Sequence, residues 1–221
     1  MEQLGLAFKG SRGGARAGAG RKPLPAGVRR TAHRARPKHH ARHPVHVTLR
    51  AEVRSLRRQH VVRTVLCALR DSGSELFRIA HYSVQANHLH LIVEAQDARA
   101  LSRGMRRLAV RLARRVNTLL ARRGRFWADR WHQHVLSSPR QVRNALVYVL
   151  QNQRKHSRTS AGVLDPLSSA QWFNGFARAL PSGFQSVGPP CVSTPQTWLL
   201  AVGWRRRGLV QFSDAPLTAR G

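Results

Sequence analysis

Three segments in the first half of the chain show the apolar and polar alternation of half-buried strands. Residues 45–49 read Val-His-Val-Thr-Leu, and residues 77–85 and 88–94 are further strand candidates. Only residues 86–87 separate the last two segments, which leaves room for nothing longer than a tight hairpin. The pattern predicts three strands, of which the second and third form an antiparallel pair.

Two longer segments have apolar residues at helical spacing. In residues 52–72 the apolar positions recur mostly every three or four residues, and Gly73 provides a stop. In residues 102–122 apolar residues form one side and a dense set of arginines the other, before Gly124 ends the pattern. We therefore expect a helix after the first strand and an amphipathic basic helix after the third.

A short strand and a further helix are expected next. Residues 131–136 read as a strand, and Ser138 followed by Pro139 is typical of a helix start. The helical pattern continues over residues 141–156. The order strand, helix, strand, strand, helix, strand, helix matches an α+β, ferredoxin-like split βαβ fold, with an antiparallel sheet, helices on one face and one appended helix.

The two ends of the chain differ in composition from this central region. Residues 1–43 are rich in Gly, Ala, Arg, Lys, Pro and His with Glu2 as their only acid, so we expect a disordered basic arm. Such an arm suits either an electrostatic hold on phosphates or a solubilising tail. The folded domain is expected over residues 44–158. Residues 159–221 are richer in Pro, Gly, Ser and Trp, and we expect a loosely structured extension with a short helix.

The charge balance points to a polyanionic partner. Of 221 residues, 39 are Lys or Arg and 9 are Asp or Glu, which gives a formal net charge of +30. A hydrophobic content of 42% allows one core of ordinary size. No apolar run approaches the roughly 20 residues of a bilayer span. Nucleic acid is therefore favoured over a membrane as the partner.

Cysteine use and the start of the chain bear on the compartment. Cys67 and Cys191 are the only cysteines, which argues against a disulfide framework or a cysteine-based zinc site. The first residues lack the apolar segment of a secretory signal, although their Arg-rich composition resembles an organellar transit peptide. We expect a bacterial cytoplasmic, nucleoid-associated protein.

Four residues suggest a site that cuts phosphodiesters. His88 and His90 occupy alternate positions of a strand and so point to one face, where both imidazoles can reach one metal ion. Tyr148 and Asn152 are four residues apart, which on a helix places a nucleophilic hydroxyl and a metal-binding amide on one side. A structural interpretation stays open, because isolated strand histidines are more often structural and Tyr148 lies between two valines, as a core tyrosine would.

Four short segments of the central region carry a resemblance to a known family. They are, in chain order, residues 46–50 (His-Val-Thr-Leu-Arg), residues 87–91 (Asn-His-Leu-His-Leu), residues 124–131 (Gly-Arg-Phe-Trp-Ala-Asp-Arg-Trp), and Tyr148 with Asn152. The region that contains them resembles the REP-associated tyrosine transposases, a branch of the single-tyrosine HUH (His-hydrophobe-His) endonucleases of insertion sequences. The His-x-His element is weak alone, and its combination with the Gly-x-x-Trp-x-x-Arg element and a tyrosine downstream makes the resemblance specific.

The resemblance implies a role for each of these residues. It implies that His88, His90 and Asn152 bind a divalent metal, Mg²⁺ or Mn²⁺, and that Tyr148 is the catalytic nucleophile. The implied partners are single-stranded or hairpin DNA and a second copy of the chain in a homodimer. The family usually has Asn-Pro where this chain has Asn152-Gln153. Because proline mainly ends a helix, we expect a longer helix here rather than a lost site.

Other residues are candidates for nucleic-acid contacts. Arg107 and Arg114 lie on the basic side of the expected 102–122 helix, which is either a solvated face or a DNA track. Trp127 and Arg130 are candidates for a clamp on unstacked bases, and the tryptophan is equally well a large core residue.

Three functions fit the sequence. The first is a DNA transposase or single-strand DNA endonuclease with a metal-assisted 5′-phosphotyrosine intermediate. The second is a domesticated protein that binds DNA or RNA hairpins without cleaving them, and the third is a nonspecific packaging protein. The candidate metal ligands and Tyr148 favour the first, since a non-cleaving binder needs none of them. A two-histidine phosphoesterase, suggested by residues 46–48, lacks the second copy of its motif.

Overall fold

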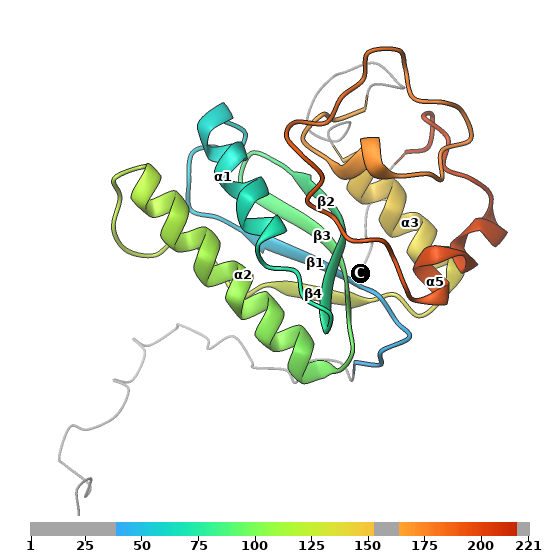
Figure 1. The fold of residues 1–221 in the computed structure, drawn as a ribbon, viewed down its shortest axis with the longest axis horizontal. Coiled ribbons are helices and arrows are strands. Elements are labelled where there is room, and N and C mark those ends of the chain that lie inside the picture. The colour runs from blue at the N-terminus through green and yellow to red at the C-terminus, as the bar shows by residue number, and fades with distance from the viewer. Residues whose placement is uncertain (1–38, 153–163, 216–221) are drawn as a thin grey trace, which may run out of the picture. The chain divides into compact units, whose positions relative to one another are not determined.

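A four-stranded antiparallel sheet forms the centre of the described structure (Figure 1). The computed structural model describes residues 39–152 and 164–215. The strands are β1 (Val45–Arg50), β2 (Phe77–Val84), β3 (His88–Ala95) and β4 (His132–Val135), in the spatial order β2-β3-β1-β4. Apart from residues 39–43, the expected basic arm lies outside the described residues.

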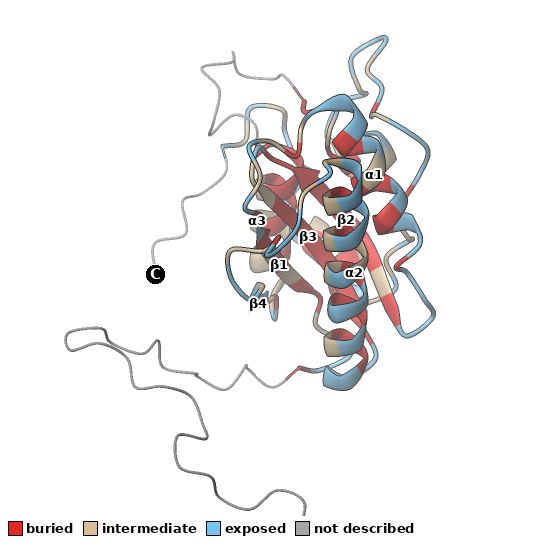
Figure 2. Ribbon diagram, turned by 90° about the vertical axis from the view of Figure 1, so that its left-hand side faces the viewer, coloured by how far each residue is buried: buried red, intermediate tan, exposed pale blue. Residues whose placement is uncertain are grey.

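The helices lie on both faces of this sheet (Figure 2). On one face α1 (Gln59–Arg70) and α2 (Ala98–Leu119) pack side by side, and α3 (Pro139–Leu150) covers the other face. The element order and the sheet order confirm the expected ferredoxin-like arrangement with an appended helix.

The sheet separates two hydrophobic cores. Alternate residues of β1 and β3 point toward α1 and α2, whose apolar stripes bury the same layer. The opposite core lies between the sheet, α3 and the C-terminal segment, and it contains Ile92, Leu146 and Trp204. The central strands are therefore covered on both faces, although only one face is uniformly apolar.

Helix α1 begins later than its apolar pattern predicts. Residues 52–58 form turns instead of the first turns of the expected 52–72 helix. The Leu56 amide donates to the Ala86 carbonyl at 2.6 Å, and the Arg57 guanidinium donates to the Val84 carbonyl at 2.7 Å. Contacts with the β2–β3 link thus compete with the helix in this segment, because they satisfy its polar groups in a non-helical conformation.

Helix α2 begins earlier than expected because Asp97 caps it. The Asp97 carboxylate accepts a hydrogen bond from the Ala100 amide at 2.6 Å, which satisfies one of the open N–H groups of the first turn. Gly104 lets this helix approach β2 closely, since a Cβ atom there would lie 2.2 Å from the Phe77 ring. The apolar side of α2 therefore sits directly on the sheet.

Helix α3 begins as predicted and ends sooner. The Ser138 hydroxyl accepts from the Gln141 amide, and Pro139 is the first helical residue. The expected helix over residues 141–156, lengthened by the absence of proline after Asn152, is wrong: α3 ends at Leu150. Beyond it, residues 151–152 form a bend and a turn, and residues 153–156 lie outside the described part.

A β-bulge in β2 changes which residues face α3. The pairing with β3 shifts between Ile79 and His81. The shift keeps apolar residues on both sides of the bulge in the α1/α2 core and turns His81 and Ser83 toward the α3 layer. Sequence alternation alone does not reveal the bulge.

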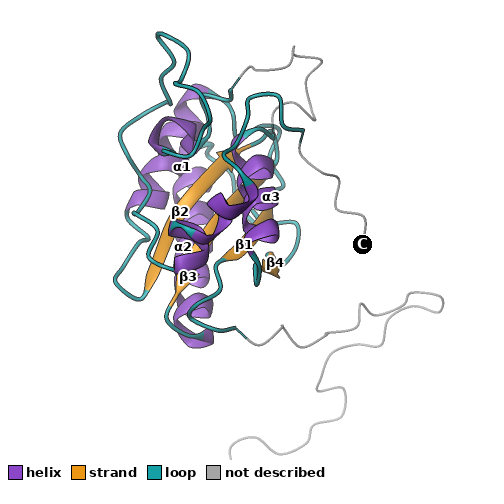
Figure 3. Ribbon diagram, turned by 90° about the vertical axis from the view of Figure 1, so that its right-hand side faces the viewer, coloured by secondary structure: helices purple, strands orange, loops and turns teal. Residues whose placement is uncertain are grey.

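The segment after α3 covers the free edge of β2 (Figure 3). The Val84 amide donates to the Leu167 carbonyl, and the Ser193 amide donates to the Ile79 carbonyl. We expected a loosely structured extension over residues 159–221. Residues 164–215 do contain only short helical turns: η1 (Ser169–Trp172), α5 (Trp198–Ala201) and η2 (Gly203–Arg207).

Three contacts nevertheless anchor this segment to the fold. Asp165, fully buried, receives two hydrogen bonds from the Arg57 guanidinium at 2.7 and 3.0 Å. The buried carboxylate of Glu94 accepts from the amide and the hydroxyl of Thr197, each at 2.8 Å. Trp204, 1% exposed, fills the core beneath α3. No helix of the described residues is long and apolar enough to span a membrane.

Candidate functional site

Strand register gathers histidines on the sheet face that α3 covers. His46 of β1 pairs with His134 of β4, and Thr48 lies opposite His90 of β3 and His132 of β4. Residues directly opposite each other in an antiparallel pair project to the same face. Five histidines of β1, β3 and β4 thus share this face with His81 of β2: His46, His88, His90, His132 and His134.

Helix α3 brings Tyr148 against this group of histidines. The centroid of the Tyr148 ring lies 5.1 Å from that of His90 and 5.4 Å from that of His46, and both contacts are edge-on. The rings of His88 and His90 stack 6.0 Å apart. Residues that are distant in sequence therefore form one continuous row of aromatic contacts, as the proposed pairing of Tyr148 with the His-x-His strand requires.

Neighbouring side chains orient both histidines of the His-x-His element. His88 Nδ1 donates to Asn87 Oδ1 over 2.7 Å, and His90 Nδ1 shares a hydrogen bond with Thr48 Oγ1 over 3.1 Å. A protonated Nδ1 leaves the lone pair of the imidazole on Nε2, which is the form in which histidine binds metals. Asn87 and Thr48 thus hold the two rings in place, and metal binding by His88 and His90 stays a prediction.

Asn152 is buried beyond the end of α3 and has unsatisfied polar atoms. Its side chain is 0% exposed, and neither its Oδ1 nor its Nδ2 has a hydrogen-bond partner in the described part of the chain. A buried amide without partners costs free energy, so such a group suits a position where a ligand completes its bonding. The helical spacing that was expected to align Tyr148 with Asn152 does not apply, because α3 ends between them.

The donor types of the expected site, two imidazoles and one amide oxygen, are ones that bind divalent metals. The described residues contain no group of three or more His, Cys, Asp or Glu side chains that could hold a metal ion. The part of Asn152 as a third protein ligand stays a prediction, and its amide atoms have no hydrogen-bond partner among the described residues.

Burial shifts the pKa of two groups in the row. Desolvation, followed by the nearby charge of His134, lowers the pKa of His46 to about 4, so this imidazole is neutral at pH 7. His46 is half-buried as a residue, and its Nε2 atom is buried without a hydrogen-bond partner in the described structure. Burial raises the pKa of the Tyr148 hydroxyl. The phenol is therefore a weak nucleophile until something assists its deprotonation.

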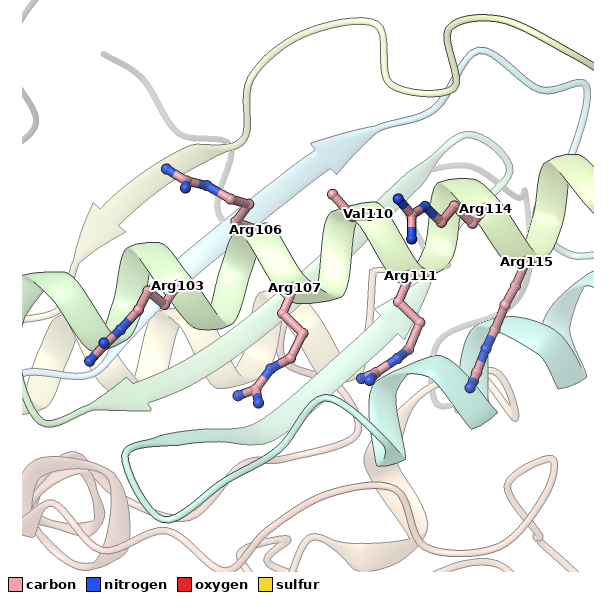
Figure 4. A pocket seen from close by; sticks show the side chains of 7 residues that line it. All are labelled: Arg103, Arg106, Arg107, Val110, Arg111, Arg114 and Arg115. Atoms are coloured by element: carbon pink, nitrogen blue, oxygen red, sulfur yellow. The ribbon is translucent and has the colours of Figure 1, made fainter.

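Three of the other four predicted nucleic-acid contacts lie on the α1/α2 side of the sheet, apart from this row. Arg107 and Arg114 lie on the outer side of α2, beyond the opposite face of the sheet (Figure 4). The Trp127 indole N–H donates to the Ala109 carbonyl of α2 at 3.0 Å, and its ring packs against the α1/α2 core. Arg130 is exposed in the loop before β4. The hydrogen bond and packing of Trp127 agree with a structural role for this residue. Its role in binding bases stays a prediction.

Sequence reasoning did not assign the residues that orient the histidines. Alternation along β1 does place His46 and Thr48 on one face of that strand. Which residues meet them depends on the register with β3, and Thr48 is 42 residues from His90 in the chain. For Asn87 the sequence did offer a signal of contact with His88, because Asn87 directly precedes His88 at the hairpin.

Comparison with solved structures finds a similar fold. The structure of a REP-associated tyrosine transposase bound to a REP hairpin is 16% identical to this chain, with a TM-score of 0.50, over 76% of this chain and 93% of that one. At this identity the likeness shows the fold. No protein-family model matches the chain, and no curated protein matches it.

Proposed function

We propose that this protein is a DNA transposase or single-strand DNA endonuclease that cuts and rejoins DNA through Tyr148. The observation that carries the proposal is the edge-on contact of the Tyr148 ring with His90, whose Nδ1 is tied to Thr48. A nucleophile beside an oriented pair of histidines suits metal-assisted phosphodiester cleavage, because the imidazoles can hold a metal close to the attacking oxygen. The fold likeness to a tyrosine transposase supports the same reaction class.

The reaction is an exchange of phosphodiester bonds. The Tyr148 oxygen attacks a DNA phosphorus, and the bond from phosphorus to the 3′ oxygen breaks. The phenol gives its proton to solvent, and the leaving 3′ oxygen takes up a proton from solvent. The products are a 5′-phosphotyrosyl link and a free 3′-OH. Attack by a 3′-OH on that link releases the tyrosine and rejoins a strand, and no external energy source is needed because one ester replaces another.

His88, His90 and Asn152 are the residues that would hold a divalent metal, Mg²⁺ or Mn²⁺. The bound metal would supply charge neutralisation at the phosphate and at the leaving oxygen. Histidine nitrogens together with an oxygen donor suit Mn²⁺ well. Asn87 and Thr48 orient the two imidazoles, and α3 holds Tyr148 against the ring of His90.

The substrate we propose is single-stranded or hairpin DNA. A net charge of +30 favours a nucleic-acid partner, and the similar solved transposase is bound to a REP hairpin. We further propose that two copies of the chain act together and that the protein works at the bacterial nucleoid.

The test is a covalent protein–DNA adduct on a denaturing gel. The chain has two tyrosines, which provides a matched control: Tyr148→Phe removes the proposed nucleophile and Tyr82→Phe removes a buried phenol in the other core. With labelled hairpin DNA from the flanks of the gene and Mn²⁺, we expect an adduct from the wild type and Tyr82→Phe, and none from Tyr148→Phe or after EDTA treatment.

Two results would overturn the proposal. An adduct that persists in Tyr148→Phe would remove Tyr148 as the nucleophile. Tight hairpin binding by the wild type without any adduct would instead identify a non-cleaving hairpin-binding protein.

A further inference from the structure

A row of arginines follows the outer side of α2, remote from the tyrosine. A groove there is lined by six arginines and Val110 (Figure 4). We call this set the α2 arginine stripe: Arg103, Arg106, Arg107, Arg111, Arg114 and Arg115. Arg103, Arg107, Arg111 and Arg115 recur every four residues and form one line along the helix, while Arg106 and Arg114 project to the other side of the groove (Figure 4). At 1.5 Å per residue the line is about 18 Å long.

Protein contacts engage only half of the stripe. The Arg111 guanidinium donates to the Asp71 carbonyl and, at 2.9 Å, to the Ser72 hydroxyl, while Arg115 pairs with the Asp71 carboxylate at 2.8 Å. Arg107 donates to the Ser74 hydroxyl at 3.3 Å. These bonds hold three of the guanidinium groups over the loop after α1.

The other three arginines lack such contacts. Within residues 39–152 and 164–215, Arg103, Arg106 and Arg114 form no hydrogen bond or ion pair. Like charges this close repel one another, and nothing in the packing of α2 requires them, because the apolar side of the helix alone contacts the sheet. An anionic partner would relieve the repulsion.

We infer that the α2 arginine stripe is a second nucleic-acid-binding surface, which takes the phosphate backbone of duplex DNA independently of the strand presented to Tyr148. The sheet lies between α2 and α3, so the stripe and the tyrosine row occupy opposite layers (Figure 2). A phosphate bound at Tyr148 is therefore not in contact with the stripe. The inference shares with the proposed function only a nucleic-acid partner.

The lining of the groove favours a duplex over a single strand. Single-strand sites usually combine cations with aromatic rings on which bases stack, and this groove has no aromatic residue among its lining residues. It also lacks the Asn and Gln side chains that read adenine. We expect its guanidinium groups to contact phosphates, which carry no sequence information, so binding should not depend on sequence. A straight row of guanidinium groups matches the regular phosphates of a duplex strand.

A membrane surface is the poorer match. Helices that lie on membranes insert an apolar face into the lipid. The apolar face of α2 is buried against the sheet through Met105, Leu108 and Leu112, and only Val110 interrupts the arginines outside.

The test compares two triple variants of the full chain. Arg103, Arg106 and Arg114 are changed to Gln in one variant, and in the matched control Arg54, Arg123 and Arg178, which are exposed and lie outside the stripe, are changed to Gln. Both variants lose the same charge. Binding of a fluorescent 20-base-pair duplex, in two unrelated sequences, is measured by anisotropy at several salt concentrations in EDTA, where the proposed cleavage plays no part.

We expect the stripe variant to bind both duplexes at least about tenfold more weakly than the control, and its plot of log affinity against log salt to be less steep by about 2 to 3. Equal slopes for the two variants would overturn the inference. So would a stripe variant that loses binding to phosphatidylglycerol vesicles but keeps its duplex affinity. The experiment measures duplex binding and not adduct formation. Its result can therefore be interpreted even if Tyr148 does not cleave DNA.

Discussion

The two faces of the sheet are built from the same strands, but one is uniformly apolar and the other carries polar side chains. On the α1/α2 face every inward residue of β3 is apolar, as Leu89 and Leu91 illustrate. On the α3 face the same strand presents His88, His90 and the buried Glu94. One face contributes a dry core, whereas the other holds polar groups that need specific partners.

The difference shows where this fold places its chemistry. Burying an imidazole costs free energy, and the lowered pKa of His46 is a sign of that cost. The apolar core on the opposite face offsets such costs, so the polar face is able to carry groups that do not stabilise the fold. Substitutions on the two faces should therefore separate stability from activity.

The largest expected effect on stability is on the apolar face. Leu91→Ala removes a fully buried side chain and should lower the free energy of unfolding by about 2 to 5 kcal/mol, because a cavity remains in the α1/α2 core. His88→Ala, three residues earlier on the polar face and only half-buried, should change it by less than about 1 kcal/mol. Urea denaturation measures both. Equal losses would mean that the two faces share the task of stabilisation.

An intermediate effect is expected from acid on the polar face. Burial lowers the pKa of His81 to about 4 from its ordinary 6.5, so between these values the unfolded chain binds the proton that the folded chain excludes. Stability is thus complete above pH 6.5 and falls as the pH decreases toward 4. For His81 the loss by pH 5 is about 2 kcal/mol.

The His81→Gln variant checks this linkage. It keeps a polar side chain beside Ser169 and removes the titration, so its stability should fall less between pH 7 and pH 5 than that of the wild type. Denaturant midpoints at the two pH values give the comparison. His46 lowers stability in acid in the wild type and in His81→Gln alike. Equal losses of stability in the two proteins between pH 7 and pH 5 would show that His81 is not a source of the acid sensitivity.

The smallest expected change concerns the orientation of His90. Thr48→Val keeps the shape of the side chain and removes its hydrogen bond to His90 Nδ1, so Mn²⁺ affinity should fall about tenfold. Stability should change by less than about 1 kcal/mol. Free Mn²⁺, counted by electron paramagnetic resonance, reports the affinity, with Thr64→Val on α1 as the control. A Thr48→Val variant with unaltered affinity would remove Thr48 from the site.

Local patterns in the sequence accounted for most of the secondary structure. Alternation over residues 45–49 predicted β1, and Ser138 followed by Pro139 predicted the start of α3. Local patterns failed where distant groups competed. Val53 and Leu56 fit a helical stripe, yet their segment forms turns because its polar groups bond to the β2–β3 link. The prediction of a longer α3 failed for a different reason. The absence of proline after Asn152 permits a helix to continue but does not make it continue.

By itself, the sequence determined the order of elements, the basic character of α2 and the residue types of the candidate site, because these depend on periodicity and composition within short windows. Only the tertiary structure decided that Thr48 would meet His90, that Tyr148 would lie against His46, and that Arg57 would pair with Asp165, 108 residues away. Such contacts depend on strand register and on the docking of whole elements. Both arise from the summed packing of many residues, which no single segment encodes.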